Sequence, residues 1–231
     1  MNAPKKICGM ILICWGLWGQ SLWAEPALQT APAWAEVEGC ATCHRFSPNQ
    51  PESTAPDLFY AGNKFQQDWL VEYLQRPTVI RQAGHTRDPG FLQGQPDFTG
   101  PHPVLKPKDA ATLAAALMTL KLPDLETVAL ATTPLSEGKK VRIKILFERD
   151  YSCIACHESY NLARQPRGGV SGPSLIDAGN RLQAEWVYLW LQQPKIFLKK
   201  GRMPVYQFDE ETLLNLTRYI ASHKKESGNK N

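Results

Sequence analysis

Apolar residues recur at helical spacing in several stretches of the chain, which predicts a protein with several amphipathic helices. The clearest stretch covers residues 63–77. There Asn63 is a suitable N-cap, Gln66 stands at the capping-box position, and Pro77 ends the run. The apolar face of this predicted helix consists of Phe65, Trp69, Leu70 and Leu74.

Three other helices are predicted from the same spacing. One covers residues 109–120, one begins at Ser136 and leads into Cys153, and the last begins at the N-cap Asp209. A shorter helix with Trp34 and Val37 one turn apart is expected to end at Gly39. The residues expected on the buried faces of the three longer helices are Leu113, Leu117 and Leu120; Val141, Ile145 and Leu146; and Leu213, Leu216 and Ile220.

The predicted helix at residues 63–77 has a second copy. A shift of 117 positions places residues 56–77 on residues 173–194 without a gap, and about ten of these 22 positions are identical. The shared residues include an Ala-Gly-Asn triplet, a glutamine, a tryptophan and the prolines at both ends. The chain is therefore predicted to be a tandem repeat.

Segments without apolar periodicity separate the predicted elements. Residues 81–101 are rich in Pro and Gly and form a long loop, and a loop longer than about 15 residues in a compact domain is usually functional or mobile. Residues 123–137 are the best candidate linker. We expect a first domain at residues 25–122, a second domain at residues 138–224 and a disordered polar tail at residues 225–231.

Residues 1–24 are predicted to be a signal peptide. Lys5 and Lys6 precede an apolar run, and the small residue Ala24 marks the expected cleavage site. This pattern indicates export to the periplasm. The alternative is an uncleaved anchor that faces the periplasm, because the run approaches the about 20 residues that span a bilayer; a membrane is an expected partner only in that case.

Two copies of the pattern C-x-x-C-H occur, formed by Cys40, Cys43 and His44 and by Cys153, Cys156 and His157. This is the attachment pattern of a c-type haem, since two thiols on one turn form thioether bonds to one haem and the adjacent histidine reaches its iron as the proximal ligand. One copy would also suit a thioredoxin-type pair, half a zinc site or a disulfide loop. The other two cysteines, Cys8 and Cys14, lie in the predicted signal peptide, so its removal leaves only the four cysteines of the two motifs. Two copies in a repeat, on an exported chain with no thiol left over, favour two haem c groups.

Each unit reads as helix, C-x-x-C-H, loop, capped helix, loop and helix. In this order of elements, each of the two units resembles the class I cytochrome c family. Together the two units cover almost all of the mature chain. The resemblance implies an all-α fold of two tandem cytochrome c-like domains, in each of which a few helices surround one covalently bound haem. The N- and C-terminal helices of each domain are then expected to cross and pack.

The resemblance also assigns roles to residues near the proximal histidines. Pro56 and Pro173 resemble the family's proline whose carbonyl accepts a hydrogen bond from the Nδ1 atom of the proximal histidine, although a plain turn proline is the alternative. Trp69 and Trp186 either pack against a haem or donate to a propionate, or they are simply buried in the core.

The sixth iron ligand differs between the predicted domains. Met203, in the run Gly201-Arg202-Met203-Pro204, stands where class I cytochromes keep their methionine; a core methionine is the alternative. The first domain has no such methionine, and Met118 is expected to pack in the core. His102 aligns with Met203, so it is the expected ligand there, with His85 or an open iron as alternatives.

Charge limits the expected partners. The formal net charge is +4 and falls to +2 without the two lysines of the signal peptide, so with haem propionates nucleic acid is not expected as a partner. Four cations crowd beside Met203: Lys195, Lys199, Lys200 and Arg202. In class I cytochromes a lysine-bordered haem edge docks on acidic redox partners, whereas a solvated charged face is the alternative.

Two functions are compatible with these patterns. The first is a non-catalytic periplasmic di-haem electron carrier or electron-transfer subunit, which passes electrons from a dehydrogenase or quinol oxidiser to a terminal acceptor. Electrons should run from the bis-histidine haem to the histidine/methionine haem, because methionine raises the potential. The alternative is an oxidoreductase whose first haem reduces peroxide or oxidises an inorganic sulfur compound. The carrier is favoured because both irons have a candidate distal ligand.

Overall fold

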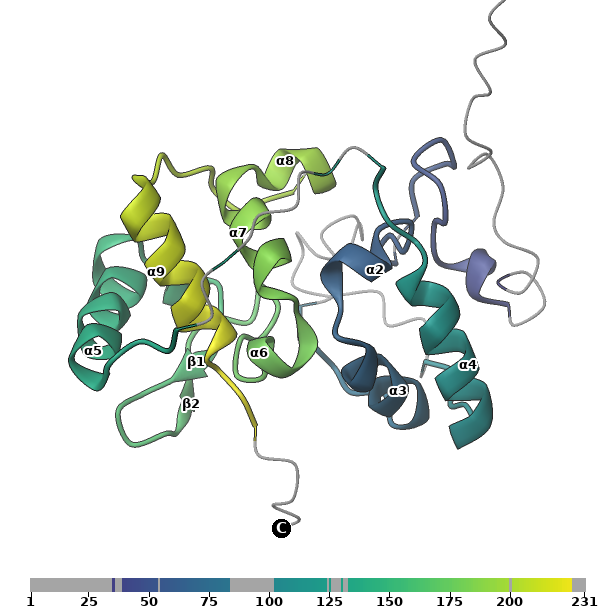
Figure 1. Cartoon of the computed structure of the whole chain (residues 1–231), viewed down its shortest axis with the longest axis horizontal. Coiled ribbons are helices and arrows are strands. Elements are labelled where there is room, and N and C mark those ends of the chain that lie inside the picture. Colours follow the sequence, from purple (N-terminus) through teal and green to yellow (C-terminus); the bar gives the residue numbers. More distant parts are fainter. Residues whose placement is uncertain are drawn as a thin grey trace, which may run out of the picture.

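The computed structural model describes Ala35 and residues 39–53, 55–83, 102–123, 125, 130, 133–199 and 201–225. Within these residues the chain is mostly helical, and its only sheet has two strands, which agrees with the predicted all-α class. The helices form two groups in Figure 1, α2 to α4 and α5 to α9. The predicted signal peptide, the predicted helix before Gly39 apart from Ala35, residues 84–101 with His85, and Lys200 lie outside the described residues.

The first unit consists of the short turn η1 (Cys40–Thr42) and the helices α2 (Ala61–Lys64), α3 (Gln67–Gln75) and α4 (Pro107–Met118). Helix α3 packs against α4, and Leu70, Leu74, Leu113 and Leu117 share one core. The helix predicted at residues 109–120 is therefore confirmed, with both ends two residues earlier in the chain. It begins at Pro107, and proline suits the first helical position because its missing N–H would have no partner there.

The second unit contains more elements. Its helices are α5 (Glu137–Ile145), α6 (Ala178–Arg181), α7 (Ala184–Gln192), α8 (Pro194–Phe197) and α9 (Glu210–Ala221), with the π-helical turn η3 (Leu146–Asp150) and the short turn η4 (Cys153–Ala155). Strands β1 (Ser159–Tyr160) and β2 (Pro166–Arg167) pair antiparallel, with Ser159 opposite Arg167 and Tyr160 opposite Pro166. Helix α7 packs against α9. None of the described helices in either unit is both long and apolar enough to cross a bilayer.

The predicted N-cap Asp209 is confirmed in the second unit, and Ser136, where the preceding helix is predicted to begin, also caps its helix. The Ser136 hydroxyl accepts a hydrogen bond from the Lys139 amide, and the Asp209 carboxylate accepts one from the Thr212 amide at 2.9 Å. Each side chain thereby satisfies an N–H group that has no partner inside the helix.

The buried face predicted for the helix after Ser136 is partly wrong. Val141 and Ile145 are 50% and 43% exposed, and Leu146 is only partly buried, whereas Ile143 and Phe147 are buried. The helix carries apolar pairs at i, i+4 spacing on two faces, so the pattern alone does not decide between them. The face with Phe147 is buried because its large ring packs against Tyr219, with ring centroids 5.7 Å apart.

The helix predicted at residues 63–77 is broken in the structure. Phe65 is extended, so α2 ends at Lys64 and α3 begins at Gln67. Asn63 lies inside α2 and does not cap the helix, and its Oδ1 atom accepts a hydrogen bond from the Leu122 amide at 2.8 Å. The N-cap prediction for Asn63 is therefore wrong.

The repeated Ala-Gly-Asn triplet holds the end of the last helix in each unit. Asn180, the equivalent of Asn63 in the second unit, accepts a hydrogen bond from the Lys225 amide at 2.8 Å. Lys225, the first residue of the tail that was expected to be disordered (residues 225–231), is therefore held by a hydrogen bond. The Gly62 amide donates to the Leu120 carbonyl and the Gly179 amide to the His223 carbonyl, both at 2.8 Å. Glycine is needed because a Cβ atom would lie 2.1 Å from the Met118 carbonyl oxygen in the first unit and 2.0 Å from the Ala221 carbonyl oxygen in the second.

The two units pack against each other around a local two-fold axis. Phe65 and Leu182 are equivalent in the repeat and form an isolated antiparallel bridge. The Gln66 amide donates to the Arg181 carbonyl and the Gln183 amide to the Lys64 carbonyl, both at 2.9 Å. Equivalent residues thus exchange equivalent hydrogen bonds, and α2 and α3 lie beside α7 and α6 (Figure 1).

A cluster of aromatic residues from both units completes this seam: Phe59, Tyr60, Trp186 and Phe197. Leu122, the last residue of the expected first domain, and Leu125 in the predicted linker pack against this cluster. Leu135, near the end of the linker, is buried in the core of the second unit. The described part of the linker therefore lies against the two units.

Candidate functional site

Both C-x-x-C-H segments have the same backbone conformation. The amide of His44 donates to the Cys40 carbonyl at 2.9 Å, and the amide of His157 donates to the Cys153 carbonyl at 3.0 Å. A residue in the left-handed conformation precedes each turn, Gly39 with φ 71° and Ser152 with φ 52°. The tight turn places two cysteines and the following histidine together, and neither cysteine pair forms a disulfide.

Each of these histidines is held by the carbonyl of a proline. The Nδ1 atom of His44 lies 2.6 Å from the Pro56 oxygen, and Nδ1 of His157 lies 2.8 Å from the Pro173 oxygen. A carbonyl only accepts hydrogen bonds, so Nδ1 carries the proton in both rings. The Nε2 atom then has a lone pair in the neutral imidazole, which is the form that ligates a metal.

The charge state of both histidines is compatible with ligation. Burial lowers the pKa of His44 and of His157 below the ordinary value, against the opposing effect of the proline carbonyls. The neutral imidazole is therefore favoured at neutral pH. In contrast, burial raises the pKa of Cys153 to about 11, which argues against a thioredoxin-type pair because a reactive redox cysteine needs a lowered pKa.

The chain segment with each histidine is fastened to the segment with its proline. The Leu58 amide donates to the Arg45 carbonyl at 2.8 Å, and the equivalent Leu175 amide donates to the Glu158 carbonyl at 2.9 Å. The first unit adds a bidentate ion pair, in which Nε and Nη2 of Arg45 lie 2.7 Å from the two carboxylate oxygens of Asp57. The Asp57 side chain has no exposed area. This ion pair could not be predicted from the sequence, which shows only that a charged residue, Arg45, follows His44 and that another, Asp57, follows Pro56.

His102 lies close to His44 in the first unit. The centroids of the two rings are 6.2 Å apart, and Nδ1 of His102 lies 3.0 Å from the Pro103 carbonyl oxygen. Two imidazoles on opposite sides of one metal ion have ring centres about 6 Å apart, since each metal–nitrogen bond is about 2 Å long and each nitrogen lies about 1 Å from its ring centre. The separation observed between His44 and His102 fits such an arrangement.

Met203 has a corresponding environment in the second unit. It is partly buried and packs against the same core as Cys153 and Ile154. The indole Nε1 atom of Trp190 donates to the Met203 sulfur at 2.9 Å. Met118, by comparison, is partly buried against the core of the first unit, as expected for a packing residue.

The repeat relates the contacts of His102 and Met203. Tyr73 on α3 and Trp190 on α7 are equivalent under the shift of 117 positions. Tyr73 meets His102 edge-on with ring centroids 5.3 Å apart, and Trp190 contacts the Met203 sulfur. The same helix position therefore contacts His102 in one unit and Met203 in the other, which supports the alignment of these two residues.

The two repeated tryptophans lie among aromatic rings. Trp69 is stacked between Phe65 and Tyr73, with ring centroids 5.3 Å and 4.7 Å away. Trp186 is 3% exposed and stacks on Tyr60 of the first unit at 4.9 Å. In the described part of the chain Trp186 is thus a residue of the seam between the units.

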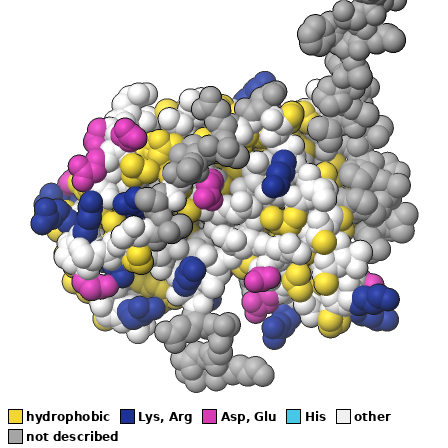
Figure 2. Space-filling view, viewed as in Figure 1, with side chains coloured by type: hydrophobic (Ala, Val, Ile, Leu, Met, Phe, Trp, Pro, Cys, Tyr) yellow, Lys and Arg dark blue, Asp and Glu magenta, His cyan; other side chains and the backbone are white. Residues whose placement is uncertain are grey.

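The surface beside Met203 combines cations with exposed apolar side chains. Lys195, Lys199 and Arg202 are exposed, and the neighbouring Ile196 and Val205 are 56% and 47% exposed. On the face drawn in Figure 2, side chains of both charges are interspersed with hydrophobic ones, and no histidine side chain is visible.

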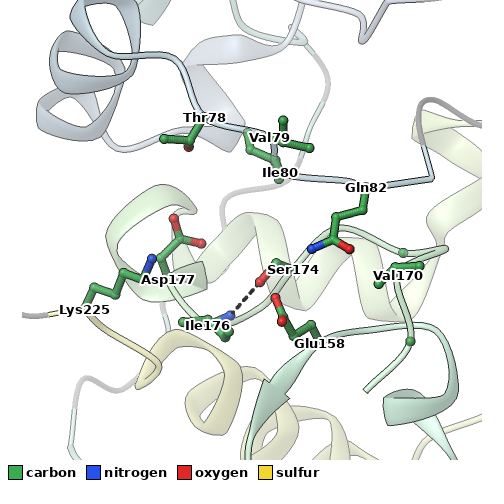
Figure 3. A pocket seen from close by; sticks show the side chains of 12 residues that line it. Thr78, Val79, Ile80, Gln82, Glu158, Val170, Ser174, Ile176, Asp177 and Lys225 are labelled. Carbon is green, nitrogen blue, oxygen red and sulfur yellow. Dashed lines mark hydrogen bonds between the residues drawn. The ribbon is translucent and has the colours of Figure 1, made fainter. Parts of the chain in front are cut away.

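A small pocket lies between the two units (Figure 3). Thr78, Val79, Ile80 and Gln82 form one wall, and residues of the second unit, including Glu158, Ser174 and Asp177, form the other. Its volume of about 160 Å³ is below the about 300 Å³ at which typical ligand pockets begin. No cysteine or histidine lines it, but two of its lining residues adjoin the second C-x-x-C-H segment: Glu158 follows His157, and the Gly172 amide donates to the Cys156 carbonyl at 2.7 Å.

Several observations fit a covalently bound haem at each segment. The cysteines share a turn, the adjacent histidine presents Nε2, and a second candidate ligand has a matched environment in each unit. Within the described residues, no three side chains of the His, Cys, Asp or Glu type form a metal site of their own, so they provide no zinc site that uses these cysteines. No protein-family model matches the chain, and neither a curated protein nor a solved structure matches it significantly.

Proposed function

We propose that this protein is an exported di-haem cytochrome c with two tandem cytochrome c-like domains. It would carry electrons in the periplasm from a dehydrogenase or quinol oxidiser to a terminal acceptor. The observation that carries this proposal is the pairing of His44 and His102, whose rings lie 6.2 Å apart with Nδ1 of each beside a carbonyl oxygen. That pairing supports two axial ligands for the first haem, which is the requirement for a carrier.

Four cysteines would attach the two haems by thioether bonds: Cys40, Cys43, Cys153 and Cys156. His44 and His157 would be the proximal ligands, with His102 and Met203 opposite them. The haem supplies a one-electron couple between ferric and ferrous iron. With one histidine and one further ligand from the protein, each iron would have no position open to a small molecule, so it would transfer electrons without binding a substrate.

The ligand sets give the two haems different potentials. Methionine is a weaker donor to ferric iron than imidazole and raises the potential, so the second haem should accept electrons from the first. The Pro56 and Pro173 carbonyls hold both proximal imidazoles in one tautomer, so they contribute equally and do not account for the difference. Lys195, Lys199 and Arg202, beside Met203, would dock an acidic redox partner by electrostatic steering.

The experiment is to express the full chain in a bacterium that matures c-type cytochromes and to purify the protein from the periplasm. We expect two covalent haems per chain, and low-spin electron paramagnetic resonance signals from both. The double variants Cys40→Ala/Cys43→Ala and Cys153→Ala/Cys156→Ala should each retain one haem. A wild-type protein without covalent haem contradicts the proposal. A high-spin first haem that binds cyanide or carbon monoxide contradicts the carrier function and supports an oxidoreductase.

A further inference from the structure

Helix α5 lies at the end of the second unit that is farthest from the first unit, with the β1–β2 hairpin beside it (Figure 1). Residues 137–168, which contain these elements, carry seven basic and four acidic side chains. The whole chain has a formal net charge of +4, and two of its lysines belong to the predicted signal peptide. The net positive charge of the mature protein is therefore concentrated at this end of the molecule.

The described residues of the first unit contain no counterpart of the β1–β2 hairpin. From the C-x-x-C-H histidine to the proline that holds it, the chain runs 12 positions in the first unit and 16 in the second. At the tip of the hairpin the Asn161 amide donates to the Gln165 carbonyl, and the Gln165 amide donates to the Asn161 Oδ1 atom, both at 2.9 Å. These bonds give the tip a fixed shape.

Two residues of the tip have features that the fold itself does not require. The Leu162 side chain is 81% exposed, the highest value among the large apolar side chains that the structure describes. Arg164 has φ 56°, in the left-handed region that favours glycine or asparagine. An exposed leucine and a strained arginine add nothing to the core, so they suit a contact outside the protein.

Helix α5 extends the surface that begins at the hairpin tip. The Lys144 ammonium donates to the Tyr160 carbonyl, so the hairpin lies along the side of α5 that carries Lys144. Val141 and Ile145 are 50% and 43% exposed and adjoin Lys144 on the helix, because residues three positions apart are neighbours there. The exposed apolar side chains of α5 and Leu162 therefore belong to neighbouring parts of one surface.

Arginine side chains flank these apolar residues. Arg142 lies three positions before Ile145 and Arg149 four positions after it, and Arg142, Arg149 and Arg164 are all exposed. Arg149 pairs with Asp150 at 2.7 Å, but an exposed ion pair is weak and exchanges readily with another anion. In the part of the chain that the structure describes, Arg142 and Arg164 form no ion pair.

We propose that this surface of the second unit docks on an anionic lipid membrane. Leu162, Val141 and Ile145 enter the boundary between the headgroups and the acyl chains, and the arginines bind headgroup phosphates. Arginine suits this position because its aliphatic part can lie in the apolar layer while the guanidinium group stays among the headgroups. The exposed apolar residues are aliphatic, whereas tyrosine and tryptophan dominate binding hot spots between proteins, which favours a lipid surface over a protein partner.

This inference depends neither on the haems nor on the predicted signal peptide. The membrane contact is made by the folded second unit, so it is expected even after cleavage at Ala24. It would hold the protein at the membrane surface with the first unit directed away from the lipid (Figure 1).

The test measures the binding of the protein, purified from the periplasm, to lipid vesicles by co-sedimentation. Vesicles of phosphatidylethanolamine and phosphatidylglycerol should bind the wild type, and vesicles of phosphatidylcholine alone should bind it much less. Binding to the anionic vesicles should weaken strongly between about 0.01 M and about 1 M salt, because the Debye length falls from about 30 Å to about 3 Å. The amides of residues 161–165 should exchange their hydrogens more slowly when the vesicles are bound.

Variants of the exposed residues separate the apolar contribution from the charge contribution. Leu162→Ser should weaken binding to the anionic vesicles about tenfold, because the leucine side chain no longer leaves water. Arg142→Gln and Arg164→Gln should each weaken it about fivefold at low salt, as expected for one cation near an anionic lipid surface. Arg142→Lys keeps the charge and should keep most of the binding. Thermal unfolding should be nearly unchanged in all four variants, since the side chains are exposed.

Val104→Ser and Arg76→Gln are the matched controls, because they alter side chains of the first unit that are 69% and 75% exposed. Both should bind the vesicles as the wild type does. All variants share the N-terminus of the wild type, so a retained N-terminal segment does not produce differences between them.

The inference is wrong if the wild type does not bind the anionic vesicles, or if Leu162→Ser and Arg142→Gln bind them as tightly as the wild type. Salt-sensitive binding of an acidic protein that Leu162→Ser weakens, without binding to vesicles, would assign the surface to a protein partner instead. Each of these results leaves the di-haem function standing. A chain that binds anionic vesicles but carries no covalent haem would overturn the proposed function and leave this inference intact.

Discussion

At the scale of single residues, the histidines of the two C-x-x-C-H segments have the same hydrogen-bond geometry. A proline carbonyl accepts from Nδ1 in each unit, and this contact follows from the resemblance to class I cytochromes c. The groups on the other side of each candidate iron site were harder to predict. The contact between Trp190 and the Met203 sulfur involves residues 13 positions apart, on a helix and on a loop whose path no periodicity describes.

Trp190→Phe removes the N–H donor to the Met203 sulfur and keeps an aromatic ring. The hydrogen bond withdraws electron density from the sulfur, so its loss should stabilise ferric iron and lower the potential of the second haem. One hydrogen bond is worth about 1 kcal/mol, which corresponds to about 40 mV. Tyr73→Phe, at the equivalent position, is the matched control for spectroelectrochemistry and should leave this potential unchanged. An unaltered potential in Trp190→Phe would show that the contact does not tune the iron.

His223 should make stability depend on pH. Burial lowers its pKa to about 4 from an ordinary value of 6.5, and the charge of Lys144 adds repulsion. Between these two values the unfolded chain binds a proton that the folded chain does not bind. Stability is therefore lost as the pH falls from 6.5 towards 4, by about 3 kcal/mol in total.

Denaturant unfolding at about pH 7 and about pH 4.5 measures this effect. The free energy of unfolding of His223→Gln should change less between the two values than that of the wild type. Equal changes in both proteins would assign the acid sensitivity to other groups.

At the scale of the elements, the predicted helices are correct where a local signal decides them. Ser136 and Asp209 cap their helices, and Leu113 and Leu117 are buried as the spacing indicates. The break at Phe65 has no such signal. It forms because Phe65 pairs with Leu182 of the other unit, a contact between residues 117 positions apart.

Gly62→Ala and Gly179→Ala should each destabilise the protein by about 1 to 3 kcal/mol, because a backbone carbonyl occupies the space of the new methyl group. Gly138→Ala is the control. Gly138 lies in α5 with no atom within 4 Å of the added carbon, so alanine should stabilise the helix by up to about 1 kcal/mol. Thermal unfolding of the three variants checks the prediction, and a stabilised Gly62→Ala would contradict the close approach of α4 to α2.

The Arg45–Asp57 ion pair should contribute strongly to the first unit. Arg45→Ala leaves the buried Asp57 carboxylate without its bidentate partner, which should cost about 3 to 5 kcal/mol. Arg76→Ala breaks an exposed pair with Glu72 and should cost less than about 0.5 kcal/mol. Denaturant unfolding compares the two variants. Similar small losses would mean that the Arg45–Asp57 pair does not fasten His44 to Pro56.

At the scale of the whole molecule, the repeat predicts two similar units but not how they pack. The packing depends on Gln66 and Gln183, which reach across the local two-fold axis. Gln183 Nε2 donates to the Phe65 carbonyl at 2.7 Å, and Gln66 Nε2 donates to the Leu182 carbonyl at 3.2 Å. In the sequence these glutamines resemble helix-capping residues, so their role between the units becomes visible only when both units are present.

The central claim is that two haems with different axial ligands lie in the two units. A potentiometric titration of the visible absorption spectrum, performed on the wild type and on His102→Met, tests it most directly. We predict two one-electron steps in the wild type, of which His102→Met raises only the lower one, since methionine in place of histidine raises the potential of the first haem. A shift of the upper step, or no shift in either step, would contradict the assignment of His102 and with it the predicted direction of electron transfer.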